Sequence, residues 1–162
     1  AVFDMNSKRL DAYGDFNYDN KDFTFEQVLQ QVVALIERLM QQYECVAIFI
    51  EDIQMQSNVE SFKRLAQLQG AIFYYCAANE ILLSTVKPSQ WQNYCKARGR
   101  TSKEIKSGVT SLEAAGKKQS KVLSLEYVRD TYGVTTLNDN VSDAICIGTY
   151  VVNNIEIRVK GD

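Results

Sequence analysis

The chain has 162 residues and a formal net charge of −2, with 46% hydrophobic and 23% charged residues. These proportions are ordinary for a globular protein that is long enough to bury a core, and we predict a single domain over residues 1–162. The chain contains no histidine, which excludes imidazole acid–base catalysis, histidine-dependent triads and zinc sites with histidine ligands.

Targeting signals are missing from the sequence. No run approaches the roughly 18 to 20 apolar residues of a membrane span, and the first residues lack the pattern of a secretory signal. The four cysteines are widely spaced and form no C-x-x-C pair, so we expect buried free thiols: Cys45, Cys76, Cys95 and Cys146. We therefore predict an intracellular protein with no membrane contact.

In the first part of the chain we expect a hairpin followed by a helix. Residues 1–4 and 10–18 are predicted strands on either side of a polar turn. Thr24 is placed to cap a helix whose apolar residues repeat at helical spacing as far as about Gln42.

The strand predicted over residues 45–51 ends on two carboxylates, Glu51 and Asp52. A carboxylate at the exit of a strand is fixed at a sheet edge and still reaches solvent, which suits a metal ligand. A helix is predicted next, over residues 59–79. Gly70 lies in its middle, and we expect close packing there, of the helix against the sheet or of one subunit against another, to offset the cost of the glycine.

The second half of the chain is predicted to add one strand, three helices and a terminal edge strand. These elements cover residues 81–86, 88–94, 122–132, 141–152 and 153–160, and Gly133 ends the second of the helices. Strands followed by crossover helices indicate a mixed α/β sheet covered on both faces.

Between residues 96 and 121 the chain is basic, with eight cationic residues against two acidic ones. Clustered cations of this kind suit contact with a polyanion, and a solvated helical face is the competing interpretation. The cationic residues are Lys96, Arg98, Arg100, Lys103, Lys106, Lys117, Lys118 and Lys121.

Three segments together resemble the RuvC-type Holliday junction resolvases of the RNase H-like superfamily, especially phage members. Residues 49–55 (FIEDIQM) resemble the family's strand ending in a catalytic glutamate, residues 65–71 (LAQLQGA) its central helix, and residues 141–148 (VSDAICIG) its closing helix. Residues 85–91 occupy the place of a family strand and the helix after it. The resemblance implies an RNase H-like mixed sheet flanked by helices.

The beginning of the sequence departs from this family pattern. Its first residues resemble the family's second strand, so the resemblance implies that the first strand and the first catalytic aspartate are missing from the sequence given. Asp4 is interpreted as a turn residue of the hairpin, with replacement of the lost ligand as the alternative.

The closing motif departs as well, because its first acidic position falls on Asn140. Either Asp139 takes over as ligand, being four residues before Asp143 and so on the same helical side, or the position is altered and activity is reduced. The alternative is that Asp139 or Asn140 only caps the helix.

The family also places a lysine near the scissile phosphate, on the helix before the closing motif. Lys103 fits the bacterial spacing, whereas Lys117, Lys118 and Lys121 fit better when counted back from Asp143. We favour Lys118 or Lys121 as the catalytic lysine. The predicted DNA contacts are Gln54, Arg98, Arg100, Lys103, Lys106, Lys117, Lys118 and Lys121.

The resemblance implies a metal-dependent endonuclease without a small-molecule cofactor. Glu51 and Asp143, with Asp139 or Asn140 and the missing aspartate, would hold two Mg²⁺ ions, with Mn²⁺ possible, about 4 Å apart at the phosphate. The substrate would be a four-way junction or other branched DNA. A homodimer is implied because a junction has two symmetric cutting points, with the dimer contact on residues 59–79.

Gln54 stands where family members carry an aromatic wedge, which predicts a relaxed sequence preference. Three other functions stay open: a junction-binding protein with impaired catalysis, an RNase H-like nuclease acting on hybrid or linear nucleic acid, and an α/β module without a nucleic-acid partner. A phage-encoded protein would work in the host cytoplasm.

Overall fold

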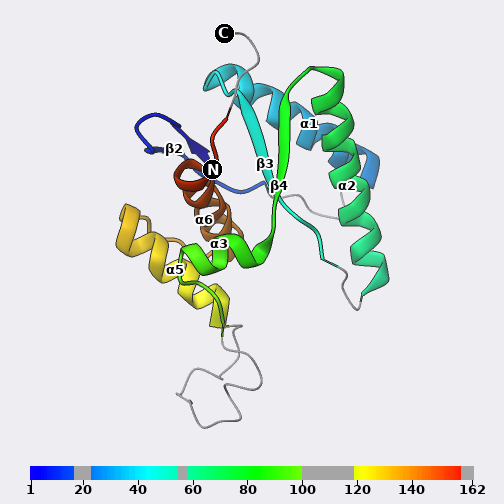
Figure 1. Cartoon of the computed structure of the whole chain (residues 1–162). Coiled ribbons are helices and arrows are strands. Elements are labelled where there is room, and N and C mark those ends of the chain that lie inside the picture. The colour runs from blue at the N-terminus through cyan, green and yellow to red at the C-terminus, as the bar shows by residue number, and fades with distance from the viewer. Residues whose placement is uncertain (17–22, 55–57, 100–118, 158–162) are drawn as a thin grey trace. The chain divides into compact units, whose positions relative to one another are not determined.

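The computed structural model describes residues 1–16, 23–54, 58–99 and 119–157 (Figure 1). Two compact units make up the chain. The first contains Ala1–Asp15 and Val86–Glu156, and the second contains Phe16–Thr85 and Ile157–Asp162. The elements below are described within these units.

The first unit begins with a short antiparallel hairpin of β1 (Val2–Phe3) and β2 (Leu10–Ala12), with Phe3 opposite Leu10. Asp4 closes its turn, because its carboxylate accepts bonds from the Ser7 N–H at 2.6 Å and the Ser7 hydroxyl at 2.8 Å. These bonds from Ser7 hold the pKa of Asp4 below its usual range. The turn role predicted for Asp4 is confirmed.

Three helices complete this unit: α3 (Pro88–Tyr94), α5 (Gln119–Tyr132) and α6 (Asp139–Asn154). α6 is the central element, in contact with α3, α5 and β1. It buries seven of its sixteen residues, and these include Ile145, Cys146 and Val151. The core of the unit therefore forms around α6, which fixes the position of the residues at its N-terminus.

Glycine has a specific purpose at two positions of this unit. A Cβ atom at Gly148 of α6 would overlap the ring of Phe3, so the glycine lets β1 lie directly on the helix. Gly133 follows the last residue of α5 with φ of +68°, and its N–H donates to the Arg129 carbonyl at 2.9 Å. The helix end predicted at Gly133 is confirmed.

The second unit contains α1 (Phe25–Gln42), β3 (Ala47–Glu51), α2 (Val59–Ala78) and β4 (Leu82–Val86), of which Val86 itself falls in the first unit. β3 pairs with β4, and Figure 1 shows both strands running in the same direction with α2 as their connection. α1 and α2 contact each other.

α1 begins as the sequence predicts. The Thr24 hydroxyl accepts from the Gln27 N–H at 3.3 Å, and the Gln27 side chain accepts from the Thr24 N–H at 2.7 Å. This reciprocal pair is a capping box, and it satisfies two N–H groups that the helix itself leaves without partners. The predicted start and end of this helix are both confirmed.

The mixed α/β class is confirmed, since β1 and β2 are antiparallel whereas β3 and β4 run in the same direction. Two expectations are wrong in the described part of the chain. The terminal strand is absent there, because Asn153 and Asn154 continue α6 and residues 155–157 form no strand. Packing of α2 against the sheet at Gly70 is not found among the described residues, since a Cβ there would meet none of their atoms within 4 Å, and packing against a second subunit stays a prediction.

All four cysteines are free thiols, as predicted. Three of them are buried, whereas Cys45 is half-buried. None of the described helices combines the length and the apolar character that crossing a bilayer requires.

Candidate active site

The N-terminus of α6 is fixed by Asn138, a residue that the sequence analysis did not single out. Its side-chain oxygen accepts from the Asn140 N–H at 3.0 Å, and its amide group donates to the Asp15 carboxylate at 2.9 Å. The same side chain thus caps α6 and ties it to the segment after the hairpin. The prediction that Asp139 or Asn140 is the cap is wrong, and Asp139 is the first residue inside the helix.

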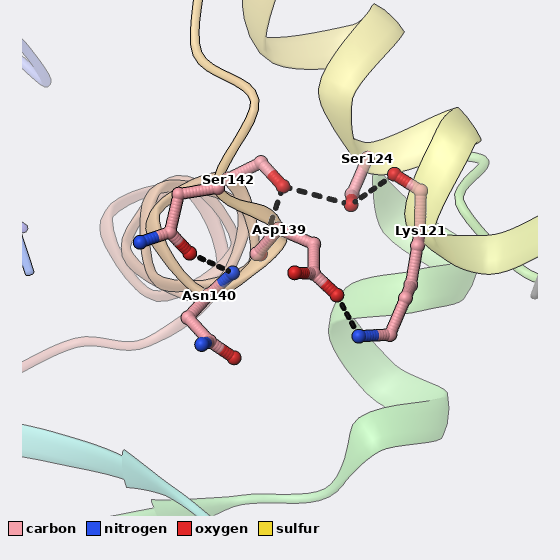
Figure 2. Close-up of polar contacts among 6 residues, drawn as sticks. Lys121, Ser124, Asp139, Asn140 and Ser142 are labelled. Carbon is pink, nitrogen blue, oxygen red and sulfur yellow. Dashed lines mark hydrogen bonds and ion pairs between the residues drawn. The ribbon is translucent and has the colours of Figure 1, made fainter. Parts of the chain in front are cut away.

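Asp139 forms an ion pair with Lys121 of α5 (Figure 2). The side chains keep 24% and 43% of their exposure, so the pair is partly withdrawn from water, and the paired Asp139 oxygen is itself shielded from solvent. Asp139 also lies in the first turn of α6, where the helix dipole favours a negative charge. Of the two lysines favoured by the sequence analysis, Lys121 is therefore placed against a candidate metal ligand.

Asp143 follows Asp139 by one helical turn and lies on the same side of α6. One of its carboxylate oxygens is shielded from solvent. Asn140, by contrast, is exposed at the surface of the helix. The N-terminal turn of α6 therefore presents two aligned carboxylates beside one ammonium group.

Two buried serines, Ser124 and Ser142, lie in the same two helices as the ion pair, and the sequence did not point to either of them as a site residue. The hydroxyls of Ser124 in α5 and Ser142 in α6 are 3.0 Å apart (Figure 2). Each serine follows a residue of the ion pair by three positions, Ser124 after Lys121 and Ser142 after Asp139. This shared spacing was visible in the sequence, although the pairing between the two helices was not.

Cys146 follows Asp143 by three residues in α6, and its thiol is kept protonated. The Cys95 thiol lies beside Cys146, and this hydrogen bond, the burial and the nearby Asp143 charge together raise the pKa of Cys146 far above its usual range. A protonated thiol is a poor nucleophile and a poor metal ligand. The chemistry of this end of α6 therefore depends on oxygen ligands and the lysine.

Glu51 is the last residue of β3 and is exposed, as expected for a carboxylate at a strand exit. Its backbone carbonyl accepts a long bond of 3.5 Å from the Gln69 side chain of α2. Glu51 belongs to the second unit and Asp143 to the first. Their convergence on one site stays a prediction.

Among the predicted DNA contacts, Gln54 and Arg98 are exposed and Lys121 lies in α5. The other predicted contacts lie outside the described residues: Arg100, Lys103, Lys106, Lys117 and Lys118. Within the described ranges, no group of three or more acidic or cysteine side chains is gathered closely enough to hold a metal ion.

A known protein family matches this chain. The family model described as crossover junction endodeoxyribonuclease RuvC matches residues 12–149. A search of curated proteins finds no match. Since the matched region covers most of the sequence and contains Glu51, Lys121, Asp139 and Asp143, the chain belongs to the RuvC family of crossover junction endodeoxyribonucleases.

Proposed function

We propose that this chain is a metal-dependent endonuclease that resolves Holliday junctions and cuts other branched DNA with a relaxed sequence preference. The observation that carries the proposal is the first two turns of α6, where Asp139 and Asp143 share one helical side and Lys121 is paired with Asp139. In a chain of the RuvC family, this is the combination of carboxylates and ammonium that phosphodiester hydrolysis needs.

The available ligands fit a hard divalent cation. The carboxylates of Glu51, Asp139 and Asp143 and the amide oxygen of Asn140 are oxygen ligands, which Mg²⁺ and Mn²⁺ prefer, and the Cys146 thiol is protonated. We propose Mg²⁺ as the physiological ion, with two ions per site and Mn²⁺ as a substitute. When bound, the ions would activate water and stabilise the departing 3′ oxygen.

Lys121 has two tasks in this proposal. Its ammonium group neutralises Asp139, so the site does not accumulate uncompensated negative charge before DNA arrives. It also supplies a positive group for a DNA phosphate beside Asp143. Arg98 and the basic residues up to Lys118 would extend the phosphate contacts.

The relaxed sequence preference rests on Gln54, which is exposed after β3. A glutamine amide stacks on DNA bases more weakly than an aromatic ring does. Recognition would then depend on the branched shape and on the phosphates, with little readout of base sequence.

The proposed homodimer uses the outer side of α2. Phe73 and Tyr74 are exposed by 43% and 78%, and Gly70 lies on the same side of the helix with open space above its backbone. An exposed apolar helix face with a glycine allows a second helix to approach closely. Two copies of the chain would present one cutting site to each of two opposed strands of a junction.

The activity is tested with the full-length native protein on a panel of substrates: fixed four-way junctions with varied core sequences, Y-forks, linear duplex and an RNA:DNA hybrid. We expect Mg²⁺-dependent cutting of junctions and forks at similar rates across the core sequences. A strong dependence on one tetranucleotide contradicts the relaxed preference. Preferential cutting of the hybrid or of linear duplex would instead indicate a different RNase H-like nuclease.

Glu51→Gln tests the metal assignment. The substitution removes the charge of an exposed carboxylate without changing its shape, so we expect cleavage to be lost while junction binding is retained. If folding and binding are lost together, Glu51 is structural instead.

A second candidate function is junction binding without efficient cutting. It is favoured by Asn140, which is neutral and exposed where the family pattern has an acidic ligand, and by the ion pair that already neutralises Asp139. Binding that persists in EDTA, together with no cutting by the full-length protein in Mg²⁺ or Mn²⁺, would support this function over the first.

A further inference from the structure

Ser124 and Ser142 connect the two helices that carry the ion pair. Both side chains are fully buried at 0% exposure, and their hydroxyl oxygens are 3.0 Å apart. The Ser124 hydroxyl also lies 3.1 Å from the Lys121 carbonyl, and the Ser142 hydroxyl lies 2.9 Å from the Asp139 carbonyl (Figure 2). The backbone of each charged residue is thus in direct contact with one serine.

The number of protons limits how these contacts are made. Each serine hydroxyl has one proton to donate, so the two residues can fill only two of the three bonds at any moment. In one arrangement Ser142 donates to Ser124, which donates to the Lys121 carbonyl. In a second, Ser124 donates to Ser142, which donates to the Asp139 carbonyl. In a third, each serine donates to the carbonyl in its own helix, and the two hydroxyls do not bond to each other. Each of the first two arrangements forms a continuous chain from one helix to the backbone of a charged residue on the other.

We propose that Ser124 and Ser142 are positioning residues that set the register of α5 against α6, and so hold the Lys121 ammonium against Asp139 in the geometry needed for catalysis. A buried polar pair at a helix contact favours one alignment, because sliding by one turn would separate the two hydroxyls and lose the bond between the helices. The catalytic part of this inference rests on the function proposed above, whereas its structural part does not.

The same two helices provide a matched control. The Tyr132 hydroxyl of α5 lies 2.9 Å from the hydroxyl of Thr149 in α6, and Thr149 donates to the Ile145 carbonyl at 2.7 Å. This is also a hydroxyl contact between α5 and α6 with a backbone carbonyl as acceptor. It lies ten residues beyond Asp139, or about 15 Å along the helix, so it stabilises the helix pair without touching the ion pair.

The first experiment compares Ser124→Ala and Ser142→Ala with Thr149→Val, in single-turnover cleavage of a four-way junction by the full-length protein. We expect each serine variant to lower the cleavage rate constant about tenfold with unchanged junction affinity, because small displacements of a catalytic group are costly. Thr149→Val should leave the rate unchanged. Equal losses in all three variants would overturn the proposal, since the serines would then act only through stability.

Ser142→Thr separates position from stability. It keeps the hydroxyl but adds a methyl group at a fully buried site, so it should be less stable than Ser142→Ala and yet more active. Activity that follows stability across the three side chains would contradict a positioning role.

The second experiment needs no nuclease activity. A double-mutant cycle of Lys121→Met and Asp139→Asn measures the coupling of the ion pair from unfolding in urea. We expect the coupling to fall by half or more when Ser142→Ala is the background, and to be unchanged when Thr149→Val is the background. An unchanged coupling in both backgrounds overturns the proposal. If the protein cuts no junction but the coupling falls, the proposed function fails and the positioning role survives.

Discussion

The ion pair between Lys121 and Asp139 makes a defined contribution to stability, which Lys121→Met and Asp139→Asn can measure. Lys121→Met keeps most of the apolar stem and removes the charge, and Asp139→Asn keeps the shape of the carboxylate. The first change leaves a charged oxygen that is shielded from solvent without its cation, so it should cost more than the second.

The expected magnitude follows from how deeply the pair is buried. Exposed pairs are worth 0.2 to about 1 kcal/mol, and breaking a fully buried pair costs roughly 3–5 kcal/mol. With side-chain exposures of 43% and 24%, this pair lies between those limits. We expect a coupling energy of about 1 kcal/mol, a loss of about 2 kcal/mol for Lys121→Met, and a smaller loss of about 1 kcal/mol for Asp139→Asn.

The assay is urea unfolding of the wild type, both single variants and the double variant at low and high salt. The cycle cancels the interaction of Asp139 with the helix dipole, because that interaction is lost in both Asn variants. Partial burial should preserve more than half of the coupling at about 1 M NaCl, where surface pairs are screened. A coupling below about 0.3 kcal/mol at low salt would refute the view that this pair organises the first turn of α6.

Three further predictions concern the rest of the fold. Gly148→Ala should lower the free energy of unfolding by about 1–3 kcal/mol, because the added methyl group overlaps the Phe3 ring; an unchanged urea midpoint would show that this ring moves freely. Gly70→Ala should raise the free energy of unfolding of the monomer by about 1 kcal/mol, since the added Cβ meets open space. Gly70→Arg should weaken the dimer in analytical ultracentrifugation, and an unaffected dimer would place the contact elsewhere. Burial raises the pKa of Tyr127, and the neighbouring thiol and burial raise the pKa of Cys146. Because the unfolded chain releases these protons at lower pH than the folded chain, the urea midpoint should fall as the pH rises above about 9. A urea midpoint that stays constant up to about pH 11 would contradict these pKa shifts.

Local signals predicted the helix boundaries well. The cap at Thr24 and the stop at Gly133 depend on residues next to the helix ends, and both were found where the sequence placed them. The cap of α6 was harder, because Asn138, Asp139 and Asn140 are all good capping residues in consecutive positions. Propensity cannot choose among them, and the choice of Asn138 also depends on its contact with distant Asp15.

The predicted terminal strand shows how packing overrides a local pattern. Residues 153–160 alternate as a strand does, but Val151 and Val152 are buried in the core of the first unit and carry the helix on to Asn154. For Gly70, the sequence predicts a contact that the described part of the chain does not supply. Its position in α2 predicts a close contact, and among the described residues the space above it is open, so the proposed contact is one with a second copy of the chain.

The sequence predicted which residues belong to the candidate site, but it did not predict how their side chains are arranged. Carboxylates at Glu51, Asp139 and Asp143 follow from the strand exit and from the acidic start of the last helix. The Ser124–Ser142 contact could not be predicted, because serines are usually exposed and the sequence of a single helix does not determine its register against another helix. The choice of Lys121 as partner of Asp139 depends on that same register.

The central claim is that Glu51 and Asp143 bind the same cations, and a Mn²⁺ titration followed by NMR tests it most directly. Mn²⁺ broadens the signals of nearby nuclei, so the backbone amides around both residues should broaden together, with one midpoint, and Mg²⁺ should reverse the effect. Glu51→Gln should shift that midpoint to higher Mn²⁺ for the amides around Asp143 as well. Broadening around only one of the two residues, or an Asp143 response that is unaffected by Glu51→Gln, would contradict the account.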